Sequence, residues 1–175
     1  GAGGSGNSVI VSEAMRALPI GLPKVLVSTL ASGNVAPYVG ISDLCLMYAV
    51  TDVQGRKLWH DQRIAREGFG VAGADRRDAA ITLRDWSLTR RAADGTWVAR
   101  LPGNDFSFDL VFEPTQPVLL QGDQGLSRKG PDPGQASYYY SLPQMAALGR
   151  ITLKGRAPEV SGQAWLDHEW SEALL

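Results

Sequence analysis

The residues best suited to chemistry are four consecutive ones near the C-terminal end, Asp167, His168, Glu169 and Trp170. Side chains alternate between the two faces of a strand, so we expect His168 and Trp170 on one face and Asp167 and Glu169 on the other. An imidazole beside an indole in an apolar cavity suits a reaction that passes through a carbocation, which the aromatic face stabilises while water adds. A purely structural role, with His168 a core residue, stays open.

A run of three tyrosines precedes this motif and is the second candidate for a ligand site. On a strand, Tyr138 and Tyr140 would point to one face and Tyr139 to the other. Inward phenols would line a long apolar ligand, whereas cross-strand aromatic packing would give them a structural role. The packing interpretation is the simpler one.

We expect no metal and no cofactor. The histidines are His60 and His168, and neither a His-x-His pair nor a cysteine pair supports a metal-ligand set. Cys45 is the single cysteine, which excludes an intrachain disulfide. The net charge of −1 gives no overall electrostatic attraction toward nucleic acid or an anionic membrane.

A glycine-rich segment, residues 3–8, precedes a predicted helix at residues 9–18. Backbone N–H groups around Gly4, Gly6 and Asn7 would then cradle a phosphate at the helix N-terminus. The segment lacks the lysine of a P-loop and does not match the dinucleotide fingerprint, so it is a weak candidate for nucleotide binding.

The chain divides into two parts, residues 1–50 and 51–175, with different patterns. The first part predicts a turn, the helix, a strand at 24–29, a loop at 31–40 and a strand at 43–50, an α/β order. The second part predicts short strands at regular intervals. These lie at residues 58–66, 81–90, 96–101, 106–113, 118–122, 137–142, 149–154 and 160–170. The fold class is therefore mainly β: an antiparallel, lipocalin-like barrel of about eight strands after a short α/β segment.

The second part resembles the carotenoid 1,2-hydratase family and the related AttH-like predicted secreted hydrolases. The resemblance covers the chain from residue 51 onward and rests on short blocks in the family's order. The two most specific blocks are Ser137-Tyr138-Tyr139-Tyr140-Ser141-Leu142-Pro143 and Gly162-Gln163-Ala164-Trp165-Leu166-Asp167-His168-Glu169-Trp170-Ser171. Weaker blocks lie at residues 63–67, 85–86, 119–123 and 127–130.

This resemblance implies a barrel that binds a carotenoid or another lipid-like molecule and, in the family, hydration of a terminal carbon–carbon double bond. It implies that His168 and Trp170 assist catalysis. We expect substrate contacts from Tyr138, Tyr140, Trp165, Asp167 and Glu169. The family's main catalytic acid lies beyond residue 175, so we expect a C-terminally truncated chain that is inactive alone, and whether it acts as an enzyme stays open. A non-catalytic apolar-ligand-binding domain is the alternative.

Substrate access would involve peripheral contact with a membrane, and relatives are often periplasmic or membrane-associated. The first residues carry neither a basic segment nor an apolar segment of a signal peptide, and the sequence leaves the compartment open.

The first part is similar to the middle of the Tm-1-like ATP-binding family. The similarity rests on short blocks at residues 3–6, 15–21, 23–24, 27–29, 31–33, 38–40 and 42–43. It implies a fusion of two fragments that meet near residues 49–53, with a nucleotide-binding fragment as a further functional alternative. A genuine N-terminal variant of the barrel family stays open.

Overall fold

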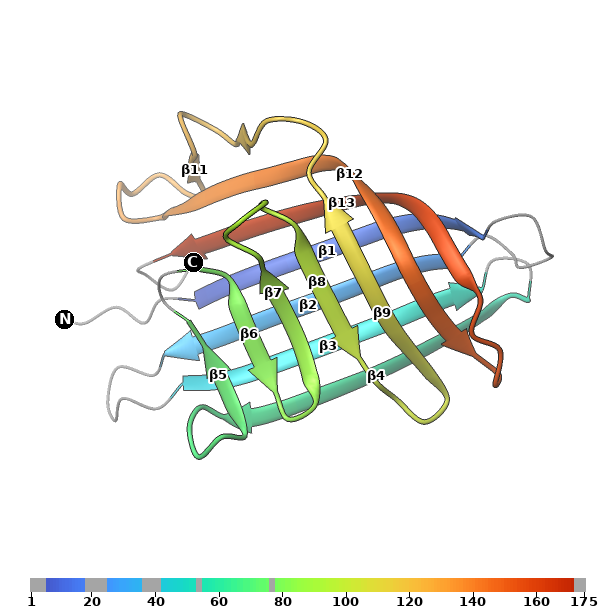
Figure 1. Cartoon of the computed structure of the whole chain (residues 1–175). Coiled ribbons are helices and arrows are strands. Elements are labelled where there is room, and N and C mark those ends of the chain that lie inside the picture. Colours follow the sequence, from blue (N-terminus) through green and yellow to red (C-terminus); the bar gives the residue numbers. More distant parts are fainter. Residues whose placement is uncertain (1–5, 18–24, 36–41, 53–54, 76–77, 172–175) are drawn as a thin grey trace.

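A computed structural model describes residues 6–17, 25–35, 42–52, 55–75 and 78–171 of the chain. Thirteen strands in this part form one sheet (Figure 1). The strands are β1 (Gly6–Ala17), β2 (Val25–Val35), β3 (Ser42–Asp52), β4 (Lys57–Arg66), β5 (Ala72–Ala74), β6 (Ala80–Leu83), β7 (Trp86–Arg90), β8 (Trp97–Leu101), β9 (Phe106–Glu113), β10 (Leu119–Leu120), β11 (Leu126–Arg128), β12 (Ala136–Leu153) and β13 (Glu159–Ser171).

The sheet is antiparallel, and its strands follow the order β4-β3-β2-β1-β13-β12-β9-β8-β7-β6-β5. The short strands β10 and β11 pair with the first half of β12, and β9 pairs with its second half. Figure 1 shows the sheet curling over, so that β5 to β9 lie in front of β1 to β4. The mainly-β, antiparallel, lipocalin-like architecture expected from the sequence is confirmed.

Among the described strands, hydrogen bonds do not close the curled sheet, because β4 and β5 are the two ends of the strand order. Side chains bridge this seam instead. Arg63 on β4 forms an ion pair with Asp85, and its guanidinium lies 4.0 Å from the centroid of the Trp86 ring. The Tyr48 hydroxyl on β3 donates to the Phe106 carbonyl oxygen at 3.2 Å. Side chains therefore join β3 and β4 to the opposite wall.

The core lies between the two walls of the curled sheet. Along β9, Phe106, Phe108, Leu110 and Phe112 are buried while Asp109 is exposed, the alternation that the sequence predicts. An aromatic cluster fills the end where the β6–β7 and β8–β9 turns lie, with ring centroids 4.6 to 6.1 Å apart. It consists of Tyr48, Trp86, Phe106 and Phe108. Burial of each such side chain stabilises the fold by about 1.5–3 kcal/mol.

The helix predicted at residues 9–18 is wrong, because residues 6–17 form β1. This strand pairs along its whole length with β13 and over most of its length with β2. An isolated helix of about ten residues is marginal in water, so two flanking ladders outweigh a helical spacing of apolar residues. The loop predicted at 31–40 is also wrong where residues 31–35 continue β2, and residues 36–41 lie outside the described part.

The described residues of the second part contain ten strands, β4 to β13, where the sequence predicted about eight. The predicted strand 81–90 is a hairpin, since Arg84 has a φ of 58° and turns the chain between β6 and β7. Two predicted strands, 137–142 and 149–154, are one long strand, β12. The division at residues 50 and 51 stays a prediction, and β3 runs across this position.

Candidate functional site

The β12–β13 ladder brings the two predicted motifs together. Tyr140 lies opposite His168, and Tyr138 lies opposite Trp170. The Tyr140 hydroxyl is 3.0 Å from His168 Nδ1, and the two rings meet edge to face with centroids 5.1 Å apart. Tyr140 packs against the core, so this pair points into the interior. The side chain of Trp170 lies outside the described part of the chain.

Burial determines the charge states of this pair. It lowers the pKa of the His168 imidazole, which is therefore neutral at pH 7. Burial also raises the pKa of the Tyr140 phenol, although the charge of Arg90 opposes this shift. Two neutral partners share one hydrogen bond, whose direction depends on the imidazole tautomer. Such a pair can accept a proton or orient a water molecule.

The opposite wall carries polar groups that sequence reasoning missed. Arg90 Nη1 at the end of β7 lies 2.9 Å from Asp78 Oδ2. Arg90 is the cross-strand partner of Trp97, which is 1% exposed. The Trp97 indole N–H has no hydrogen-bond partner among the described residues. No spacing in the sequence links Asp78, Arg90 and Trp97 to the motif at 167–170, so no signal pointed to them.

Asp167 lies on the opposite face of β13 from His168, as strand alternation requires. Its Oδ1 atom accepts hydrogen bonds from Ser141 Oγ at 2.5 Å and from Trp165 Nε1 at 2.8 Å. Gln121 Nε2 donates in turn to Ser141 Oγ at 2.9 Å. Asp167 therefore ties β13 to β12 and to the segment that follows β10.

Glu169 lies on this outer face as well. Its Oε1 atom accepts from Ser137 Oγ at 2.5 Å and is 2.5 Å from Lys129 Nζ. Burial raises the pKa of Glu169, but the hydrogen bonds from Lys129 and Ser137 and the charge of Lys129 outweigh it and lower the pKa. Glu169 is therefore an ionised member of a structural network. Trp165, Asp167 and Glu169 face away from His168, and the substrate contacts expected of them stay predictions.

Tyr138 and the glycine-rich segment are placed differently from the Tyr140–His168 pair. Tyr138 is 46% exposed. Gly4 lies outside the described part, whereas Gly6 and Asn7 belong to β1 and lie opposite Ser171 and Trp170. A phosphate cradle at this point required a helix N-terminus, and a strand occupies the position instead. Gly6 and Asn7 therefore do not form the predicted cradle at a helix N-terminus.

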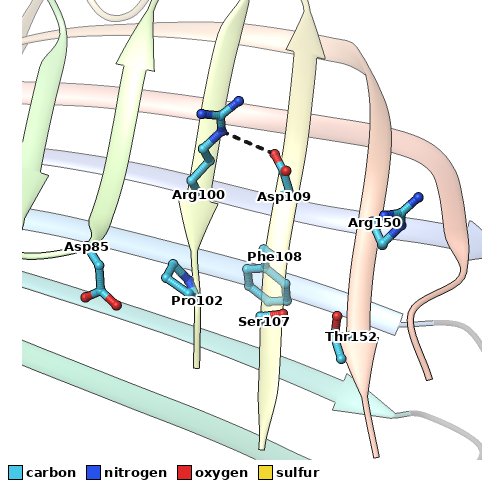
Figure 2. Close-up of a pocket in the computed structure, with 8 residues that line it drawn as sticks. All are labelled: Asp85, Arg100, Pro102, Ser107, Phe108, Asp109, Arg150 and Thr152. Atoms are coloured by element: carbon cyan, nitrogen blue, oxygen red, sulfur yellow. Dashed lines mark ion pairs between the residues drawn. The ribbon is translucent and has the colours of Figure 1, made fainter. Parts of the chain in front are cut away.

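A shallow pocket of about 300 Å³ lies on the outer face of β8, β9 and β12 (Figure 2). It contains none of the site residues expected from the sequence. Arg100 lies 3.5 Å from Asp109, and Arg150 lies 3.5 Å from Glu159. Arg100, Asp109, Arg150 and Glu159 are successive cross-strand partners, so the row is a ladder of alternating charges. In the described residues, no three His, Cys, Asp or Glu side chains are grouped to hold a metal ion, and no helix could cross a membrane.

Several known proteins are similar to one part of the chain. The sequence model of an uncharacterised family, the UPF0261 N-terminal domain, matches residues 1–79. A UPF0261 protein of Mesorhizobium japonicum is 60% identical over 55 residues, 31% of this chain and 14% of its own length. The tomato mosaic virus resistance protein Tm-1 of Solanum lycopersicum is 53% identical over 73 residues, 42% of this chain and 10% of its own length. The similarity of the first part to the Tm-1-like family is confirmed, and this chain spans only a small share of those relatives.

Solved structures resemble nearly the whole chain. An AttH protein of Nitrosomonas europaea is 35% identical with a TM-score of 0.87, over 97% of this chain and 52% of its own. Kievitone hydratase of Nectria haematococca is 13% identical with a TM-score of 0.69, over 97% of this chain and 48% of its own, and shows the fold alone. This chain spans about half the length of each. The sequence model of the AttH-like family matches residues 43–175, and the chain therefore belongs to the AttH-like family.

Proposed function

We propose that this chain binds a long apolar molecule, a carotenoid or another lipid-like compound, in the interior of the curled sheet beside Tyr140 and His168. Within a longer protein it would take part in adding water to a carbon–carbon double bond of that molecule. The observation that carries this proposal is the neutral, inward-facing Tyr140–His168 pair, with 3.0 Å between the phenol oxygen and Nδ1. One protein of the same fold is named a hydratase, which supports the reaction class.

The proposed hydration proceeds in two steps. A proton adds to one carbon of the double bond, and aromatic faces stabilise the cation on the other carbon by about 0.5–2 kcal/mol. A water oxygen then bonds to the cationic carbon and its proton passes to the neutral imidazole of His168, which returns it to solvent. The first proton needs a donor, and neither Asp167 nor Glu169 supplies it, because both are held on the other face. The donor in this scheme lies outside the described residues.

Non-catalytic binding of an apolar ligand is the second candidate. The observation that favours it is the same commitment of Asp167 and Glu169 to Ser141, Ser137 and Lys129. In that case the Tyr140–His168 pair would hold a polar end of the ligand. Neither candidate involves nucleic acid.

A thermal-melting experiment tests the shared part of both candidates. Detergent-solubilised acyclic carotenoid should raise the melting temperature of the chain, and His168→Phe should reduce this rise. The outer-face variant Arg100→Gln is the control and should leave it unchanged. The absence of a rise with acyclic carotenoids, cyclic carotenoids and fatty acids would reject both candidates.

Product analysis separates the two candidates. We expect no hydrated product from this chain alone, because Asp167 and Glu169, the carboxylic acids that flank His168 in the sequence, are held on the other face of β13. Turnover by the chain alone would show that the donor is present and that the assignment of Asp167 and Glu169 to a structural role is wrong.

A further inference from the structure

One end of the sheet carries four exposed cations, two of which lie over one indole ring. We call this group the basic rim, and it consists of Arg56, Lys57, Leu58, Trp59, Lys154 and Arg156. Its residues come from the turn between β3 and β4, the start of β4, and the turn between β12 and β13. In Figure 1 the start of β4 and the β12–β13 turn lie at the same end of the sheet.

Trp59 is where these two segments meet. Lys57 Nζ lies 4.9 Å from the centroid of its ring, and Lys154 Nζ lies 5.2 Å from the same centroid. Lys154 and Gly155 have φ values of 51° and 72°, so a two-residue hairpin turn holds Lys154 at the tip. Trp59 also packs against the core, which anchors the rim to the folded sheet.

The four cations of the rim are not neutralised by ion pairs within the described part of the chain. None of Arg56, Lys57, Lys154 and Arg156 forms an ion pair with a carboxylate of the described residues. Asp52 is buried and accepts the Gly55 N–H at 2.7 Å. Asp105, in the neighbouring β8–β9 turn, is an exposed carboxylate that reduces the local positive charge without forming an ion pair to the rim.

The rim also presents apolar surface. Leu58 lies between Lys57 and Trp59 in the sequence, points to the opposite face of β4 from both, and is 56% exposed. Exposed cations beside a tryptophan and an exposed leucine are the combination found where proteins rest on a lipid headgroup layer. A polyanion such as nucleic acid would use the cations but would leave Leu58 without an apolar partner.

We propose that the basic rim docks the protein onto the surface of an anionic lipid bilayer. The net charge of −1 does not oppose this contact, because salt screens charges farther away than about 8–10 Å and the bilayer interacts mainly with the rim. The proposal is independent of the reaction in the interior. The basic rim is then the surface through which the protein makes peripheral membrane contact.

Vesicle co-sedimentation tests the proposal on the full chain. We expect binding to vesicles of phosphatidylcholine with phosphatidylglycerol, weak binding to phosphatidylcholine alone, and release by added salt. The double variant Arg56→Asn/Arg156→Gln removes two charges that make no ion pair, and it keeps a residue tolerant of positive φ at position 56. Each cation raises the partition coefficient of the protein onto anionic vesicles about fivefold, so this double variant should bind these vesicles about 25-fold more weakly.

Three comparisons make the test decisive. The control Arg100→Gln/Arg150→Gln removes two arginines from the outer face and should change binding less than twofold. Asp105→Asn should strengthen binding, and Leu58→Ser should weaken binding to vesicles without changing binding to heparin. Equal binding to both kinds of vesicle would overturn the proposal. So would unchanged vesicle binding by an Arg56→Asn/Arg156→Gln variant that circular dichroism shows to be folded. Equal binding of the protein to heparin and to vesicles would also overturn it.

Discussion

Replacing Lys129 with methionine tests whether the ion pair between Lys129 and Glu169 stabilises the fold. The ammonium lies 2.5 Å from Glu169 Oε1, and both side chains are about one third exposed, at 33% and 32%. A buried charge-assisted hydrogen bond contributes about 1.5–3 kcal/mol, and solvent at this exposure screens the interaction to about 1 kcal/mol. Methionine keeps most of the apolar stem, so Lys129→Met should lower the free energy of unfolding at pH 7 by about 1 kcal/mol.

The pH dependence follows from the pKa of Glu169, which the folded state holds below its ordinary value of 4.5. A lowered carboxyl pKa contributes stability that is fully present above the unfolded pKa and is lost as the pH falls through the folded pKa. The wild-type chain should therefore lose stability on acidification below about pH 4.5 more steeply than Lys129→Met. The two proteins should become equally stable once Glu169 is protonated in both.

Urea unfolding at pH 7 and at a series of lower pH values measures this difference. In a separate thermal melt at pH 7, the melting temperature of the variant should be about 2–4 °C below that of the wild type. Arg150→Met removes an exposed cation 3.5 Å from Glu159 and is the matched control, which should change stability little. A loss at Lys129→Met that stays constant as the pH falls would mean that the contact of the Lys129 ammonium with the Tyr139 ring, 5.5 Å from the ring centroid, is responsible, and the argument from the Glu169 ion pair would be wrong.

Two further predictions concern the core. Trp86 and Trp97 are both almost fully buried, but the Trp86 N–H donates to the Pro102 carbonyl at 2.8 Å while the Trp97 N–H has no partner among the described residues. Trp86→Phe should therefore cost about 2 kcal/mol more than Trp97→Phe in urea unfolding, and equal losses would contradict this assignment. Gly149→Ala should cost at least about 2 kcal/mol, because φ is 144° and an added Cβ would lie 2.1 Å from the Asp109 carbonyl oxygen. Gly134→Ala, where a Cβ meets nothing within 4 Å, is the control, and equal effects of the two substitutions would contradict the argument.

The site shows how far the sequence alone leads. Strand alternation predicts that His168 and Asp167 face opposite ways, and the hydrogen bonds of both residues agree with this. The pairing of His168 with Tyr140 depends on the register between β12 and β13, which includes a shift between Leu142 and Met145. No local pattern encodes that register, so the sequence named both residues without predicting their contact.

The first 50 residues show the opposite case. Their apolar spacing fits a helical face, yet residues 6–17 are a strand because β13 and β2 offer hydrogen bonds along both edges. β13 is distant from β1 in the sequence, and residues with no strand pattern separate β2 from β1. A nonlocal ladder of this kind outweighs local propensity, and a reading of the local pattern cannot anticipate it.

The sequence by itself determined the mainly-β class, the alternation of β9 between core and solvent, the family membership and the opposite orientations of His168 and Asp167. These properties depend on residue type and on the two-residue period of a strand, both of which are local. The tertiary structure decided that β1 is a strand, that Tyr140 meets His168, that Arg63 bridges the open seam, and that Lys57 and Lys154 share the Trp59 ring. Each of these depends on how far the sheet curls and on which distant strands it brings together, and only the folded chain specifies both.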